Sequence, residues 1–254
     1  MKTQSLMIST LSLLLIHLLA ACGSDTAPSE SQEVTDTPEP ICTEIQDVEC
    51  VDNMVLDLSL QNSVATTSVT TRRESENWVT FVDATTGGFG NSSSNPWIYI
   101  RFTESGAEKV EINDNQALES MDWHLAAHRF KLRLNSGSGG PSCVSAAVLL
   151  ESEYDNISEV PANLTFYKDN FYTADCTLIQ DSYGLGSPQV YMSNWWTYEG
   201  CVATTSVPFI IQLDNGQVIK LKVEEYYQEG QANCNATNAT GTGGGNFKLR
   251  WRHL

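Results

Sequence analysis

The feature that most constrains how this chain can fold is an alternation of apolar and polar residues with a period of two. In a β-strand, successive side chains point to opposite faces, so the alternation gives each strand one apolar face. It is clearest in residues 207–227, where two alternating runs flank the tripeptide Asp-Asn-Gly at 214–216. These turn residues tolerate the positive φ angles of a tight hairpin. The sequence therefore predicts a β-hairpin here, with Lys220 and Lys222 on its outer face.

Similar runs recur along the chain and extend the prediction to the whole fold. Four further strands are predicted, at 97–103, 129–135, 143–150 and 247–252. Helix signals are confined to one short segment within 113–130, and the glycine-rich residues 241–245 are expected to form a flexible loop. Residues 42–254, roughly 210 in number, are enough for one domain of this kind. We therefore expect a single all-β domain of antiparallel sheets with hairpins and little helix.

Residues 1–21 resemble the signal peptide of a bacterial lipoprotein. A positive charge near the start is followed by a short apolar run and by Leu-Ala-Ala-Cys at 19–22, which is the order of a lipobox. Cleavage there would leave Cys22 as the first residue, where it carries the lipid. The next residues, 22–41, are acidic and rich in Ser, Thr and Pro, so we expect a disordered tether. The alternative is an ordinary secretory signal with an incidental cysteine.

The expected location follows from the lipid anchor. The net charge of the chain indicates which partners are not expected. Gly23 stands where Asp would favour the inner membrane of enteric bacteria, so we expect a lipid-anchored protein of the bacterial outer membrane, either periplasmic or surface-exposed. No later run of eighteen apolar residues suggests another membrane span. A formal charge of −17 repels phosphate backbones, so a nucleic-acid partner is not expected.

The cysteines beyond Cys22 are even in number, which in an exported chain indicates disulfides. We expect Cys42 to pair with Cys50, because the two are close in sequence, and the sequence leaves the other pairs open. A zinc site is the competing interpretation, but no Cys-x-x-Cys pair occurs. The six candidates are Cys42, Cys50, Cys143, Cys176, Cys201 and Cys234.

The sequence offers little support for catalysis. His124 and His128 have the spacing of a zinc-protease helix, but the glutamate that should follow the first histidine is replaced by Leu125. In a strand, residues four apart lie about 13 Å from each other, too far to bind one ion. Neither a Gly-x-Ser-x-Gly motif nor a phosphate loop is present. We therefore expect a protein that is not an enzyme and has no metal-ion site.

Two blocks of the sequence combine distinctive residue types in a fixed order. The first, at 122–139, has Asp-Trp, Leu-Ala, a basic and an aromatic residue, an alternating strand ending in Asn, and then Ser-Gly. The second, at 195–254, has clustered aromatics, the hairpin, a Tyr-Tyr pair, an insert and a last strand starting with Phe. Together these blocks resemble the HmuY-type lipoproteins, and the resemblance covers roughly residues 97–254. The signature residues in the first block are Asp122, Trp123, Arg129, Phe130, Asn135 and Gly139.

The resemblance implies a single all-β domain on the outer membrane that captures haem, or a similar flat hydrophobic ligand. It also implies delivery to an outer-membrane receptor of the TonB-dependent type, for iron acquisition. The alternative is the same fold without haem, as a structural or adhesion lipoprotein of the cell surface. Within the chain, the long segment 152–200 is rich in aromatic residues, among which the ligand is expected to bind.

Characterised members of that family hold the haem iron with pairs of histidines or of methionines. The candidates here are Met192, His128 and His124, and none of them can be matched to a ligand pair. Met192 is the best placed, since it lies in the aromatic segment, whereas both histidines fall inside the signature and are expected to face the core. Trp123 and Phe130 are expected to be core anchors, and Arg129 and a carboxylate are expected to pair.

Overall fold

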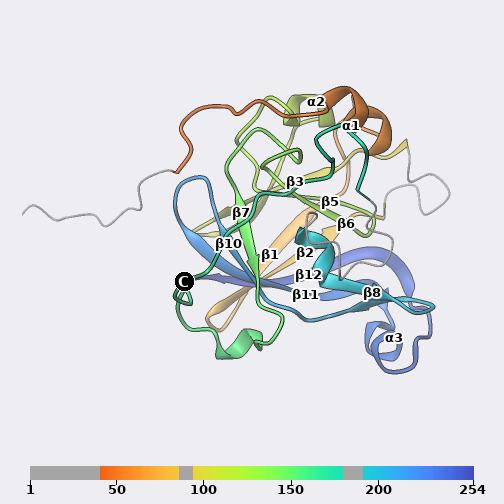
Figure 1. Ribbon diagram of the computed structural model, residues 1–254. Helices are drawn as coiled ribbons and strands as arrows, with labels where there is room; N and C mark the ends of the chain where they lie inside the picture. Colours follow the sequence, from red (N-terminus) through yellow and green to blue (C-terminus); the bar gives the residue numbers. More distant parts are fainter. Residues whose placement is uncertain (1–40, 86–93, 180–190) are drawn as a thin grey trace, which may run out of the picture. The chain divides into compact units, whose positions relative to one another are not determined.

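The computed structural model describes residues 41–85, 94–179 and 191–254 (Figure 1). The expected signal peptide, Cys22 and all but the last residue of the tether lie outside these ranges. The described residues form antiparallel strands in three sheets, with only short helices between them. The prediction of an all-β fold built from antiparallel sheets is confirmed.

The largest sheet has six strands in the order β1-β2-β12-β11-β10-β7. The predicted hairpin is present, since Phe209 pairs with Leu221, and Gly216 in the turn has a φ of 82°. The expected glycine loop is wrong: residues 242–245 belong to β12, where Gly244 pairs with Tyr227. The strands are β1 Val69–Glu74, β2 Asn77–Asp83, β7 Ser145–Val148, β10 Phe209–Gln212, β11 Val218–Glu229 and β12 Thr242–His253.

The second sheet has four strands in the order β4-β3-β5-β6. One of its faces, which includes Ile100 and Leu125, packs against the first sheet in a large core cluster. Its other face, which includes Tyr99 and Ala126, is buried in a second cluster. Both faces of this sheet are therefore covered, although alternation had predicted a half-buried strand at 97–103. The strands are β3 Ile98–Thr103, β4 Gly106–Val110, β5 Leu125–His128 and β6 Lys131–Leu134.

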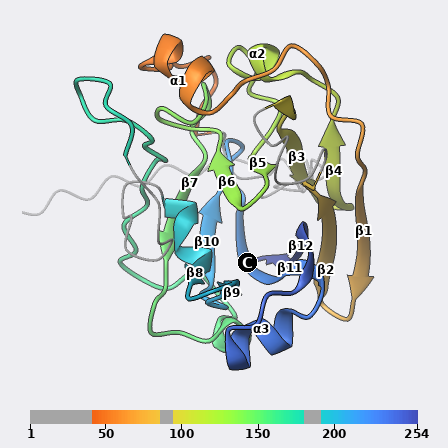
Figure 2. The same ribbon diagram turned by 90° about the vertical axis from the view of Figure 1, so that its right-hand side faces the viewer.

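Short helices cover the ends of the sheets. Helix α1 packs on the outer face of the four-stranded sheet, since its Met54 lies in the second cluster with Trp97. Helix α3 packs beside β9, at the end of the fold away from α1 and α2 (Figure 2). The remaining elements are α1 Val51–Asp57, α2 Asp114–Ala117, η2 Tyr154–Asn156, η3 Tyr191–Trp195, β8 Trp196–Tyr198, β9 Val202–Thr204 and α3 Gln231–Thr237.

Lys220 lies on the outer face of the hairpin, as predicted, but that face is covered at this position and not open to solvent. A third cluster forms on that face, where segment 149–166 packs over Ile210. Lys220 is 2% exposed, and its Nζ donates to the carbonyl oxygens of Tyr154 at 2.7 Å and Ile157 at 2.6 Å. Burial, together with the charge of Arg252, lowers the pKa of Lys220 to about 8. The lysine thus fastens the covering segment to the sheet.

Three disulfides use the six predicted cysteines, but the expected pair Cys42–Cys50 is wrong. Proximity in sequence did not decide the pairing, because the segment before α1 runs across the sheets and meets partners more than 100 residues away. Two bridges fasten this N-terminal segment to the body, and the third joins the turn between β8 and β9 to α3. The pairs are Cys42–Cys143, Cys50–Cys176 and Cys201–Cys234.

Candidate functional site

Asn135, at the end of the signature strand, is a buried structural side chain. Its Nδ2 donates to the carbonyl oxygens of Trp123 at 2.8 Å and Ser120 at 3.1 Å. Its Oδ1 accepts from the backbone N–H of Ser142 at 3.1 Å. Asn135 is 0% exposed, so these bonds replace its lost contacts with water. It therefore ties the β5–β6 hairpin to the turn that follows.

Three other signature residues, Trp123, Gly139 and Asp122, also have structural surroundings. Trp123 is fully buried in the second core cluster. A Cβ on Gly139 would lie 2.4 Å from the carbonyl oxygen of Leu134, so only glycine fits this approach. Asp122 is exposed and pairs with Arg101 at 3.2 Å. None of these residues lines a cavity among those described.

A buried cation that the sequence did not single out as special lies on the outer face of β6. The guanidinium of Arg133 is stacked within 4.5–5.5 Å of the rings of Trp97, Tyr99 and Trp123. Its Nη2 donates to the hydroxyl of Tyr99 at 2.6 Å, and that hydroxyl donates to Asp114 at 3.0 Å. Burial raises the pKa of Asp114, and the charge of Arg133 opposes that shift. This cluster is packed core, and it stabilises the sheet beneath α1.

His124 is fully occupied by structural hydrogen bonds. It is 1% exposed, and its Nδ1 accepts from the backbone N–H of Phe102 at 3.0 Å. Its Nε2 lies 2.9 Å from Asp214 Oδ1, so the proton sits on Nε2. Burial alone would raise the pKa of Asp214, but the hydrogen bond from His124 and the charge of Arg101 hold it below its usual range. Both ring nitrogens are engaged, which leaves His124 without a lone pair for a metal.

The other two ligand candidates also point away from any shared site. His128 ends β5 and stacks on Trp97 at 5.1 Å, on the outer face of the four-stranded sheet. Met192 lies in η3 and is 0% exposed, within the large core cluster. The structure does not bring His124, His128 and Met192 together.

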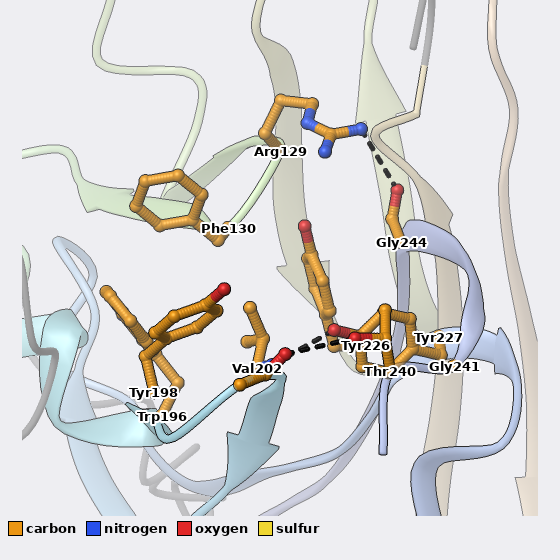
Figure 3. Close-up of a pocket in the computed structure, with 11 residues that line it drawn as sticks. Arg129, Phe130, Trp196, Tyr198, Val202, Tyr226, Tyr227, Thr240, Gly241 and Gly244 are labelled. Carbon is orange, nitrogen blue, oxygen red and sulfur yellow. Dashed lines mark hydrogen bonds between the residues drawn. The ribbon is translucent and has the colours of Figure 1, made fainter. Parts of the chain in front are cut away.

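A cleft of about 480 Å³ with mostly aromatic walls lies beside the core (Figure 3). Its walls come from segments far apart in the sequence: the β5–β6 turn, the β8–β9 hairpin, the end of β11 and the start of β12. Its volume falls within the range of about 300–1,000 Å³ that is usual for small-molecule sites. The side chains that dominate its lining are Arg129, Phe130, Trp196, Tyr198, Tyr226 and Tyr227.

The β5–β6 turn supplies one rim of the cleft. Arg129 has a left-handed backbone with a φ of 55°, and its Nη1 donates to the carbonyl oxygen of Gly244 in β12 at 3.2 Å. Phe130 was expected to be a core anchor, but it is only partly buried at the edge of the core. Its ring packs edge-on against Trp196, with centroids 5.2 Å apart. The β5–β6 turn therefore directs the Phe130 side chain toward the cleft.

The β8–β9 hairpin supplies the opposite wall, and α3 holds it in place. The disulfide Cys201–Cys234 joins the hairpin to the helix. Next to it, the backbone N–H of Val202 donates to the hydroxyl of Tyr227 at 3.0 Å, and Gln231 Nε2 donates to the carbonyl oxygen of Val202 at 3.2 Å. Tyr198, at the end of this wall, is 54% exposed, and its hydroxyl points into the cleft (Figure 3).

Glycines in β12 make room for the tyrosines of β11. A Cβ on Gly244 would lie 3.1 Å from Cε1 of Tyr226, closer than most real contacts. The Tyr226 ring is 3% exposed, and burial raises the pKa of its hydroxyl, which stays protonated at neutral pH. The charge of Arg129 partly opposes that rise. Residues 242–245 of the expected loop are thus part of a strand, and the aromatic rings of β11 lie against it.

Sequence reasoning had expected the ligand among the aromatics of 152–200, and the structure puts two of these, Trp196 and Tyr198, on the cleft. The sequence did not predict that Arg129 lines the cleft, and no role in the site was predicted for the Tyr-Tyr pair at 226–227. The pair could have been noticed as large rings that continue the alternating strand toward a glycine-rich partner.

The described residues show neither a metal cluster nor a membrane helix. No group of three or more His, Cys, Asp or Glu within 41–85, 94–179 and 191–254 lies close enough to hold a metal ion. In the same part of the chain, no helix is long and apolar enough to cross a membrane.

Comparison with known proteins gives a family match and distant structural likenesses. The model of the family described as HmuY protein matches residues 93–238, which is more than half of the chain. No curated protein matches the sequence.

Three similar crystal structures have low sequence identity to this chain. A protein described as HmuY-like and heme-binding, from Bacteroides vulgatus, is 16% identical with a TM-score of 0.45, over 72% of this chain and 96% of that one. The apo HmuY analog of Tannerella forsythia is 16% identical with a TM-score of 0.43, over 75% and 98%. A lipoprotein of Bacteroides fragilis is 13% identical with a TM-score of 0.40, over 72% and 95%.

Proposed function

The chain belongs to the HmuY family, and from that premise we propose that it binds haem, or a similarly flat hydrophobic ligand, in the aromatic cleft. The observation that carries the proposal is the lining of this cleft, in which five aromatic side chains surround a space of about 480 Å³. Flat aromatic ligands gain both apolar burial and ring stacking in such a site.

The cleft fits the organic ring of a porphyrin better than it fits the expected iron ligation. His124 and Met192 are buried elsewhere, and His128 stacks on the far face of its sheet. When bound, haem would supply an iron centre. The residues of this chain would hold the ring faces and exclude water from them. We therefore propose binding and transfer, and not catalysis, as the role of the site.

We further propose that the protein acts on the bacterial outer membrane, anchored through a lipid on Cys22, and that it passes its ligand to a TonB-dependent receptor for iron acquisition. The lipobox-like order of residues at 19–22 supports the anchor. The surface acidity, with a formal charge of −17, supports an exported and highly soluble domain.

The test is a titration of the purified full-length protein with haemin, followed by visible absorbance and calorimetry. Tyr198→Ala removes a stacking wall and is expected to weaken binding about tenfold, since an aromatic contact contributes roughly 0.5–1.5 kcal/mol beyond its buried area. Tyr167→Ala is the matched control, because Tyr167 is 47% exposed and Tyr198 is 54% exposed, and Tyr167 lines a different groove.

Two results would count against this function. Absence of saturable haemin binding would favour the alternative, a structural or adhesion lipoprotein of the cell surface. Equal weakening by both tyrosine variants would show that haemin adheres to exposed aromatics and not to the cleft.

A further inference from the structure

The charge distribution around the cleft is unusual for this molecule. The chain carries a formal charge of −17, so its surface repels anions. Among the described residues that line the cleft, Arg129 is the only one with a formal charge at neutral pH. A single cation beside aromatic walls therefore attracts an anionic group locally, where the nearby apolar surface strengthens the interaction relative to water.

The position of Arg129 is fixed by the backbone on both sides of the cleft. It occupies a left-handed turn conformation, with a φ of 55°, between β5 and β6. Its Nη1 donates to the Gly244 carbonyl oxygen at 3.2 Å, which bridges the two sheets at the rim. A guanidinium offers five N–H donors in a plane, a geometry that matches a carboxylate. The bond to Gly244 therefore orients a group that can meet a ligand carboxylate.

The aromatic residues determine which edge of a ligand would meet this cation. Figure 3 shows Trp196 and Tyr198 across the cavity from Arg129, with Tyr226 and Tyr227 on a third side. A flat ring stacked on these walls directs one edge toward the arginine. The Tyr226 hydroxyl stays protonated, so it adds a hydrogen-bond donor and not a competing negative charge.

We propose that the cleft selects flat aromatic ligands that carry a carboxylate on one edge, and that Arg129 is the residue that selects them. The inference rests on the proposed function, because it assigns the ligand class of the same cleft. The chemistry concerns the organic part of the ligand alone. It therefore applies equally to a porphyrin with and without a metal.

The test compares iron-free protoporphyrin IX, a dicarboxylic acid, with its dimethyl ester, which keeps the ring and loses both charges. Binding of each to the full-length protein is followed by quenching of tryptophan fluorescence in one detergent-containing buffer. The natural protein is expected to bind the acid at least about tenfold more tightly than the ester, and Arg129→Gln is expected to bring this ratio close to one by weakening the acid alone.

Lys131→Gln is the matched control, since it removes the same charge two residues away, on β6 and outside the cleft lining. It is expected to leave the acid-to-ester ratio within twofold of the natural protein. Thermal melts and circular dichroism of both variants establish that they are folded, so that a lost preference reports on the site.

The outcomes separate the two claims. Equal binding of acid and ester by the natural protein overturns the selection by Arg129 and leaves the aromatic cleft as the binding site. A parallel loss of both ligands in Arg129→Gln, or an equal loss of preference in Lys131→Gln, also overturns it. If the natural protein binds neither porphyrin nor haemin, the proposed function itself fails.

Discussion

At the scale of single residues, buried polar side chains join segments of the chain through hydrogen bonds. Asn135 satisfies every side-chain atom that it buries, through bonds to Trp123, Ser120 and Ser142. Buried polar groups cost free energy unless they are paired, so a satisfied network favours a single arrangement of the segments that it joins. Part of the family signature therefore stabilises the fold.

Replacing Asn135 with Ala should destabilise the protein by about 2–4 kcal/mol, because it leaves buried backbone groups at Trp123 and Ser142 without their partners. Urea unfolding measures the loss. The control is Asn115→Ala, since Asn115 is exposed and its side chain bonds to the likewise exposed Asn62, and it should change stability by less than about 0.5 kcal/mol. Equal effects of the two substitutions would contradict this role for Asn135.

Arg133 shows what a sequence pattern cannot reveal about one residue. The alternation in 129–135 correctly put it on the opposite face of β6 from Leu132 and Leu134. That face is ordinarily solvent, but here Trp97 and α1 bury it. Burial depends on a helix some 80 residues earlier in the chain, and a local pattern carries no information about it.

At the scale of elements, capping chemistry explains which helices the sequence predicted. Helix α2 begins at Asn113, whose side chain and that of Gln116 form a capping box, and a short helix was expected there. Helices α1 and α3 begin at Cys50 and Gly230, which both have left-handed backbones and no side-chain cap. Disulfides, and not capping side chains, hold these two helices in place, so the local sequence did not predict them. Strands β1 and β2 were not predicted either.

The β8–β9 hairpin depends on its neighbours for its shape. Its two strands have only three residues each, and an isolated two-stranded hairpin is at best marginally stable in water. Its attachments are the disulfide Cys201–Cys234 and the side chains of α3 that bond to β9. Because this hairpin forms one wall of the cleft, its order should control ligand affinity.

Breaking the Cys201–Cys234 bridge with a double Ser variant should lower stability by about 4 kcal/mol and also weaken porphyrin binding several-fold. The control is the double Ser variant of Cys50–Cys176, whose longer loop predicts a larger loss, about 5 kcal/mol, with affinity unchanged among the folded molecules. Urea unfolding and fluorescence titration measure the two quantities. A loss of affinity in both variants would show that the effect is global and not specific to the wall.

At the scale of the whole molecule, the cleft is assembled from four segments, and Arg129 meets a residue 115 positions away. Alternation identified most strands that carry these segments, and the aromatic content identified part of the lining. The juxtaposition itself depends on strand order and on the glycines of β12, which were expected to form a loop. Long-range assembly of this kind leaves no signature in a local window, so the sequence could suggest a ligand class but not the site.

The pattern of charges across the largest sheet also belongs to the whole molecule. On its outer face, Glu224 lies between Arg250 at 2.5 Å and Lys248 at 3.2 Å, and Arg250 reaches Glu74 at 3.1 Å, so that the ion pairs link β11, β12 and β1. Burial alone would raise the pKa of Glu224, but the hydrogen bond and charge of Arg250 and those of Lys248 hold it below 4.5. Asp114 is shifted the other way, above its ordinary 3.8.

These shifts set the sign of the acid response. A carboxyl whose pKa is lower in the folded state contributes stability above its unfolded pKa, and this contribution is lost as the pH falls through the folded pKa. For Glu224 the full contribution is therefore present above pH 4.5. Asp114 opposes it, since a raised pKa contributes stability below pH 3.8 that is lost as the pH rises through the folded value.

The variant Glu224→Gln should therefore be less stable than the natural protein at pH 7, by about 1–2 kcal/mol, because it removes a carboxylate that pairs with two cations in a partly buried site. The difference should shrink between about pH 5 and pH 2, where the natural protein protonates Glu224 and loses the same pairs. Glu229→Gln, the same charge change on an exposed residue of β11, serves as the control. Urea unfolding at a series of pH values measures both, and a difference for Glu224→Gln that stays constant down to pH 2 would mean that these ion pairs do not stabilise the sheet.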